Sequence, residues 1–133
     1  MSLTNEDKQV LMQLHLDKCH TCLADGEQLL KIDSISAAAN RFYYAVFHAI
    51  HALFVANGIY SKSHHGTNAQ FHQHFIKTGI IDPKYGHFIA VMENMREKAD
   101  YDVIYDVTRE DIEALKPVAY ELVEQIEKLL NTK

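Results

Sequence analysis

The chain has 133 residues, of which 47% are hydrophobic, and this length is enough for one domain, over residues 1–133, with a buried core. Its formal net charge is −5, which excludes a general nucleic-acid-binding surface but not a local basic pocket. No apolar run can span a bilayer and the N-terminus lacks a secretory pattern, so we expect a cytoplasmic protein without membrane contact.

Apolar residues recur at helical spacing through most of the chain and predict helices. Thr4, with Asp7 three residues later, is a typical N-cap, and Thr108 repeats the pattern with Asp111. Gly79 is expected to end a short third helix. We expect helices over residues 4–31, 34–57, 67–78, 83–101 and 108–130. Short connections between amphipathic helices predict an all-α fold, an antiparallel up-and-down bundle of about four to five helices.

The second predicted helix contains the segment NRFYYAVFHAIHALF, residues 40–54, and it has no polar face. A helix that is apolar all round lies at the centre of a fold, or is shared between a core and a subunit interface. We therefore expect a homodimer that buries part of this helix or of the fourth one. Arg41, Tyr44 and His48 follow one another at three- and four-residue steps, so they are expected to line one side of the helix.

Arg96 borders the apolar stripe of the fourth helix, and Asp100 lies one turn further along. A guanidinium at the margin of an apolar face needs a carboxylate or a phosphate as its partner. Two interpretations stay open. Arg96 and Asp100 form a structural ion pair, or Arg96 faces a groove in which it is held for an anionic ligand.

The segment KSHHG, residues 62–66, directly precedes the predicted third helix. Helix N-termini attract anions through their free N–H groups, and Lys62 and His64 beside one would favour a phosphate. Against this, a serine before a helix is usually a cap, and histidines in loops are usually solvated. An anion site and a simple helix cap both remain open.

The segment Cys19-His20-Thr21-Cys22 imitates a metal-binding or redox motif. It lies within a helix, lacks a second pair of ligands at zinc-finger spacing, and places Cys19 on the apolar stripe. We interpret both cysteines as packing residues and expect no metal site and no cofactor.

Four blocks in the same order, AANRFYYAVFHAIHAL, KSHHG, FIKTG and REKADY, resemble the small prokaryotic HEPN proteins. The resemblance covers nearly the whole chain and implies an up-and-down helical bundle, commonly a homodimer. It also implies a place in toxin–antitoxin-like pairs, because HEPN proteins are often encoded beside minimal nucleotidyltransferases. Many HEPN toxins are metal-independent ribonucleases whose motif is an arginine followed a few residues later by a histidine.

Arg96 matches the motif arginine and Glu97 matches the polar residue that usually follows it, but the histidine is missing. Asp100 lies near its place, as in the subfamily with Arg-x-x-x-Asp-Tyr. A metal-independent ribonuclease needs a group that deprotonates or positions the ribose 2′-OH and a group that stabilises charge on the phosphate. Arg96 has the chemistry for the second role, and His48 and His64 are candidates for the first. Whether the protein is an enzyme stays open.

We therefore expect a groove that binds a nucleotide or an RNA phosphate, or that holds a nucleotidyltransferase partner. One alternative is a metal-independent ribonuclease that uses Arg96 with His48 or His64, and the other is a purely structural dimerisation module. The expected ligand-binding residues are Arg41, Tyr44, His48, Lys62, His64, Arg96, Asp100 and Tyr101.

Overall fold

The computed structural model describes residues 3–101 and 106–131, which form helices joined by short loops, and no strand occurs within these ranges. The all-α prediction is therefore confirmed. No helix in the described ranges is long and apolar enough to cross a membrane. The elements are α1 (Asn5–Lys31), α2 (Ile35–Ala56), α3 (His64–Phe71), the π-helix η1 (His72–Ile76), α4 (Pro83–Tyr101) and α5 (Arg109–Asn131).

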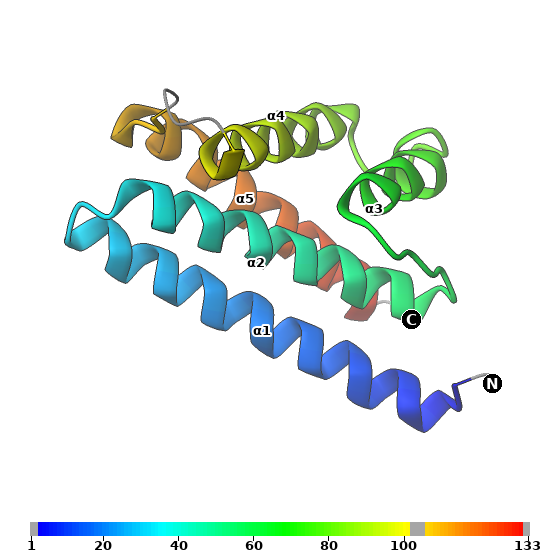
Figure 1. Ribbon diagram of the computed structural model, residues 1–133. Helices are drawn as coiled ribbons and strands as arrows, with labels where there is room; N and C mark the ends of the chain where they lie inside the picture. Colours follow the sequence, from blue (N-terminus) through cyan, green and yellow to red (C-terminus); the bar gives the residue numbers. More distant parts are fainter. Residues whose placement is uncertain (1–2, 102–105, 132–133) are drawn as a thin grey trace.

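Helix α2 is the central element of the bundle. It runs antiparallel to α1 along most of its length, while α5 and α4 pack against its other sides and α3 lies beside its C-terminal end (Figure 1). Eleven of its residues are buried: Ala38, Ala39, Phe42, Tyr43, Ala45, Val46, Ala49, Ile50, Ala52, Leu53 and Phe54. The chain itself thus covers the apolar surface of α2, which no longer argues for a homodimer, and the dimer stays a prediction.

The helix starts follow the predicted capping residues. Thr4 accepts a hydrogen bond from the backbone N–H of Asp7, whose carboxylate accepts one in return from the backbone of Thr4. Thr108 and Asp111 exchange the same pair of hydrogen bonds at the start of α5. Each pair satisfies two N–H groups that a helix start leaves without partners.

The prediction for the third helix is wrong at its start. Helix α3 begins at His64 rather than near residue 67, because the Ser63 side chain accepts a hydrogen bond from the backbone N–H of Gly66 and acts as the N-cap. His64, His65 and Gly66 therefore lie in the first turn of α3 and not in a loop before it. The helix also changes to the wider π form over His72–Ile76.

Three histidines connect α1, α2 and the start of α3. The Nδ1 atoms of His15 and His48 are 3.1 Å apart, and the rings of His15 and His51 have centroids 5.6 Å apart. His51 Nε2 lies 3.2 Å from the hydroxyl of Thr67, which is fully buried. Burial, followed by the charges of neighbouring histidines, lowers the pKa of both His48 and His51 to about 4, so these rings are neutral near pH 7.

We predict that Gly26→Ala destabilises the fold. A Cβ at Gly26 would lie 2.8–2.9 Å from three ring atoms of Phe42, a side chain that is only 1% exposed. Overpacking of this kind costs about 1–3 kcal/mol, which exceeds the gain of about 1 kcal/mol that alanine brings to a helix interior. Urea denaturation should show lower stability for Gly26→Ala. In a Phe42→Leu background the same change should become neutral or stabilising, whereas stabilisation in the native background would contradict the close contact.

We also predict that acidification weakens the fold through the histidine cluster. The unfolded chain binds protons at His48 and His51 below about pH 6.5, whereas the folded chain does not bind them until about pH 4. The contribution of these two histidines to the free energy of unfolding is therefore fully present above about pH 6.5 and is lost as the pH falls from about 6.5 to about 4. Because the rings are only half-buried, we expect a loss of about 1 kcal/mol for each of His48 and His51.

Urea denaturation at about pH 7.5 and about pH 5 measures this loss. The variant His48→Gln should show a flatter pH dependence than the native chain. The control variant His74→Gln changes an exposed histidine of η1 that lies outside the cluster, and it should keep the native slope. If the free energy of unfolding changed equally with pH in all three proteins, the loss of stability in acid would not come from the histidine cluster.

Candidate functional site

Arg96 of α4 points inward, and its side chain is only 10% exposed. Its Nη1 donates a hydrogen bond of 3.0 Å to Asp100 Oδ2, and its Nη2 lies 3.9 Å from a Glu97 carboxylate oxygen. The guanidinium carbon lies 5.2 Å from the ring centroid of Tyr43, within the range of a cation–π contact. The Nε–H group of Arg96 is buried and has no hydrogen-bond partner among the described residues. The predicted Arg96–Asp100 pair therefore exists, but it does not use all the donors of Arg96.

Burial alone would lower the pKa of Arg96, but the phenols of Tyr43 and Tyr44 and the carboxylate of Asp100 outweigh it and raise this pKa above its usual value. Burial raises the pKa of Tyr43 to about 12, although the charge of Arg96 acts in the opposite direction. At neutral pH the site thus combines a fixed positive charge with a protonated phenol.

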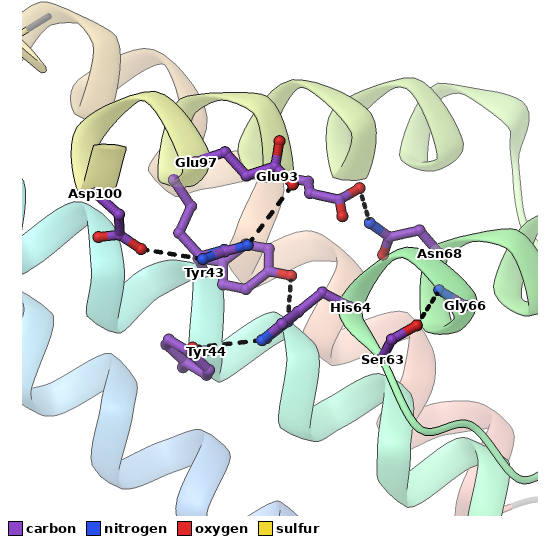
Figure 2. A network of polar contacts seen from close by, with 10 residues as sticks. Tyr43, Tyr44, Ser63, His64, Gly66, Asn68, Glu93, Glu97 and Asp100 are labelled. Carbon is purple, nitrogen blue, oxygen red and sulfur yellow. Dashed lines mark hydrogen bonds and ion pairs between the residues drawn. The ribbon is translucent and has the colours of Figure 1, made fainter. Parts of the chain in front are cut away.

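His64, in the first turn of α3, lies between two tyrosines of α2. Its Nδ1 is 2.8 Å from the hydroxyl of Tyr43, and its Nε2 is 3.5 Å from the hydroxyl of Tyr44. Figure 2 shows this pair of contacts beside the row of polar side chains on α4. Burial, followed by the charge of Arg96, lowers the pKa of His64. A neutral imidazole has one donor and one acceptor, so one of the phenols donates to the ring and the other accepts from it.

Arg41 of α2 has neutral partners. Its Nε and Nη2 donate to the side-chain oxygen of Asn40 at 3.2 Å and 2.7 Å, its Nη1 lies 3.8 Å from the sulfur of Cys22, and its guanidinium lies 5.4 Å from the ring centroid of Tyr44. Within residues 3–101 and 106–131, no carboxylate lies at ion-pair distance from Arg41. A partly buried guanidinium without a carboxylate is suited to an anionic ligand.

Both arginines line one cleft of about 350 Å³ between α4 and the facing parts of α1 and α2. We call it the arginine cleft. Its lining residues are Leu29, Ser36, Ala37, Ala39, Asn40, Arg41, Arg96, Ala99 and Asp100. Small side chains of α2 leave the space open. The polar side chains of the lining are Ser36, Asn40, Arg41, Arg96 and Asp100. The cleft therefore offers two guanidinium groups and one carboxylate.

The structure brings some of the predicted site residues together and separates others. Arg41, Arg96 and Asp100 share the arginine cleft, and the ring of Tyr44 lies against the guanidinium of Arg41. His64 contacts the hydroxyls of Tyr43 and Tyr44, and the ring of Tyr43 lies against Arg96. His48 instead faces His15 of α1. Lys62 is exposed before α3, and Tyr101 is 82% exposed, so neither lines the arginine cleft.

The sequence did not single out Tyr43, Asn40 or Glu93 as site residues. Tyr43 contacts both Arg96 and His64, and Glu93 accepts a hydrogen bond from the side-chain amide of Asn68 (Figure 2). Tyr43 lies off the helix face marked by Arg41, Tyr44 and His48, so spacing within α2 could not select it. Only the packing of α3 and α4 against α2 makes it part of the site.

The two cysteines of α1 are both buried, Cys19 completely. Burial, followed by the charge of Glu127, raises the pKa of the Cys19 thiol to about 12, which disfavours the thiolate that metal binding needs. In the part of the chain that the structure describes, no group of three or more histidine, cysteine, aspartate or glutamate side chains could hold a metal ion.

Known proteins resemble the chain over nearly all of its length. It is 31% identical to a UPF0332 protein of Thermotoga maritima, over 93% of this chain and 94% of that protein. Two proteins of Methanocaldococcus jannaschii named "putative toxin" are 29% identical, over 89% of this chain and 80% of theirs, and 30% identical, over 97% and 96%. The HEPN domain family matches residues 12–129, which include α2, the start of α3 and α4 with Arg96. The chain belongs to the HEPN domain family.

Proposed function

We propose that the chain is the toxin-like member of a toxin–antitoxin-like pair and binds a nucleotide or RNA phosphate in the arginine cleft. The observation that carries this proposal is that Arg41 and Arg96 line the same cleft while Arg41 has no carboxylate partner among the described residues. The names of the two Methanocaldococcus jannaschii relatives support the toxin-like role.

The geometry of the arginine cleft suits a phosphate for two physical reasons. Guanidinium groups bind phosphate oxygens through paired, charge-assisted hydrogen bonds, and such bonds are stronger when water is partly excluded. Asp100 and the ring of Tyr43 hold the side chain of Arg96 in place, so little of its conformational freedom is left to lose on binding. Asp100 offsets one of the two positive charges, which leaves Arg41 as the main source of attraction.

The same cleft explains how an acidic protein could bind an anion. The net charge of −5 is spread over the whole chain, whereas a bound phosphate would respond mainly to groups within about one Debye length, roughly 8–10 Å. Arg41 and Arg96 are both in contact with the cleft. Association should therefore be slower than for a basic protein, because long-range steering is absent.

We predict that Arg41→Ala weakens binding of mononucleotides and short RNAs by about tenfold to a hundredfold, the usual loss for one charge-assisted contact. Fluorescence polarisation with a mononucleotide panel and a short single-stranded RNA measures this loss. The melting temperature should change little, since Arg41 makes no ion pair with a described carboxylate. Arg96→Ala should weaken binding as well, but it should also lower the melting temperature, because Asp100 loses its partner.

The matched control is Lys84→Ala, which removes one positive charge from an exposed site at the other end of α4. This variant should bind like the native chain. If the native chain bound no nucleotide and no RNA, and Arg96→Ala only lowered the melting temperature, the structural interpretation would replace the functional one.

A metal-independent ribonuclease is the second candidate function, and the position of His64 favours it. Tyr43 contacts the guanidinium of Arg96 through its ring and the imidazole of His64 through its hydroxyl, so these two candidate groups share one neighbour. The lowered pKa of His64 keeps the ring neutral and able to accept a proton near pH 7. We propose His64, rather than His48, as the histidine that acts with Arg96.

If the chain cleaves RNA, we predict that His64→Ala lowers the cleavage rate by about a hundredfold or more, the usual contribution of a general base. His48→Ala should leave the rate nearly unchanged, because its ring faces α1. The rate should fall on the acid side at a pH below the ordinary histidine value of about 6.5, since the His64 pKa is lowered. A time course with labelled RNA in the presence of a chelator measures all three. Equal losses in both histidine variants would exclude a specific role for His64.

The partners belong to the same proposal. We propose a homodimer and a nucleotidyltransferase-like antitoxin as the partners of this chain. An exposed apolar pair on one face of α1 supports a protein contact there, since Val10 is 61% and Leu14 is 55% exposed and they lie four residues apart.

A further inference from the structure

A second cleft, of about 260 Å³, lies between α3 with η1 on one side and α4 on the other. His65, Asn68, His72 and Glu93 supply its polar groups, and Phe71 and Ile89 are among its apolar lining residues. We call it the histidine cleft. No residue of the arginine cleft lines it, so the two clefts are separate.

The wall of the histidine cleft has an unusual local structure. His72 begins the π-helix η1, and π-helical turns occur mostly as short segments that are frequent at functional sites. Gly86 of α4 lets the two walls approach closely, because a Cβ there would lie 3.3 Å from His72 Nδ1 and 3.4 Å from Ile76 Cγ1. The π-helix and the close approach of α4 at Gly86 thus place His72 at the edge of the histidine cleft.

The two clefts open along one face of α4. Ile89, Glu93, Arg96 and Asp100 follow one another at steps of four, three and four residues, which places them on the same side of the helix. Figure 2 shows two separate contacts along α4, that of Asp100 with the guanidinium of Arg96 and, nearer the start of the helix, that of Glu93 with Asn68 of α3. Arg96 lies seven positions after Ile89, which is about 10 Å along the helix axis.

The chemistry of the two clefts differs. The arginine cleft contains two guanidinium groups, whereas no lysine or arginine is among the described residues that line the histidine cleft, and Glu93 contributes a carboxylate there. A carboxylate repels phosphate but accepts hydrogen bonds from the N–H groups of a nucleobase. Imidazole rings offer flat surfaces on which a base stacks, as in proteins that recognise single-stranded RNA.

We propose that the histidine cleft binds a nucleobase of a single-stranded RNA whose phosphate lies between Arg41 and Arg96. This inference rests on the proposed phosphate site. Glu93 accepts from the base edge, with Asn68 fixing its carboxylate, and His72 or His65 stacks on the base. The distance of about 10 Å along α4 from Ile89, in the histidine cleft, to Arg96, in the arginine cleft, corresponds to roughly three stacked nucleotide steps of about 3.4 Å each. A strand of about four nucleotides therefore reaches both clefts.

The test compares adenosine monophosphate with an oligoadenylate of about four nucleotides by fluorescence polarisation or calorimetry. The native chain should bind the longer strand at least about tenfold more tightly. Two variants change the histidine cleft without entering the arginine cleft: His72→Ala removes a stacking surface, and Ala90→Phe fills the space from an exposed position of α4. Both should reduce the affinity for the oligonucleotide by about tenfold and leave the affinity for the mononucleotide unchanged. The control is His74→Ala, an exposed histidine of η1 that does not line the cleft.

The outcomes separate this inference from the proposed function. If the mononucleotide and the oligonucleotide bound equally well to the native chain, or if both histidine-cleft variants kept the native preference for the longer strand, the nucleobase site would be wrong while the phosphate site stood. If the native chain bound neither ligand, the phosphate site itself would fail. If free adenosine still bound to Arg41→Ala and affinity did not increase with strand length, the proposal that one strand occupies both clefts would be wrong.

Discussion

The contact of Tyr43 with both Arg96 and His64 is the interaction on which the candidate site depends. The phenol ring faces the guanidinium from α4, and the hydroxyl meets the imidazole from α3, while the tyrosine itself is almost completely buried in α2. Three helices that are far apart in the sequence therefore meet at one side chain. Because a cation–π contact and a hydrogen bond restrain different ends of the same ring, both Arg96 and His64 have fixed positions before any ligand binds.

This arrangement also explains why polar groups can occupy an otherwise apolar helix. An unpaired polar group in a protein interior costs roughly 1–3 kcal/mol, so the polar residues of α2 need partners. Tyr43 and Tyr44 find theirs in His64, His48 finds His15, and His51 finds Thr67. One side of α2 thus contacts α1 through His48, and another side contacts α3 and α4 through Tyr43 and Tyr44. The histidines near α1 stabilise the bundle, whereas the tyrosines near α4 shape the site.

The sequence predicted the features that local chemistry decides. The order of the helices and their ends within a few residues, and the capping pairs of Thr4 with Asp7 and Thr108 with Asp111, follow from spacing and from side-chain acceptors close in the chain. The Arg96–Asp100 hydrogen bond was also predictable, since residues four apart on a helix are neighbours. These features depend on contacts between residues close in the sequence.

Features that depend on packing between helices could not be predicted from the sequence. A three- and four-residue spacing placed His48 on the same side as Arg41 and Tyr44, but the helices that cover that side decide where each ring points. The start of α3 at His64 rather than near residue 67 has the same origin. Ser63 takes the capping role, and the earlier start brings His64 between the two tyrosines of α2. Neither the π-helix nor the close approach at Gly86 has a pattern in the sequence that spacing could detect.

Helix α4 is central to the proposed binding of RNA because both clefts lie along one of its faces. Its buried residues, among them Phe88, Met92 and Met95, anchor it in the bundle core, while Glu93, Arg96 and Asp100 face the clefts. A small shift of α4 would therefore move Arg96 relative to Arg41 of α2 and Glu93 relative to α3 at the same time. The hydrogen bond from Asn68 to Glu93 opposes such a shift by tying the middle of α4 to α3. Recognition of a strand that spans both clefts would depend on this fixed spacing more than on the strength of any single contact.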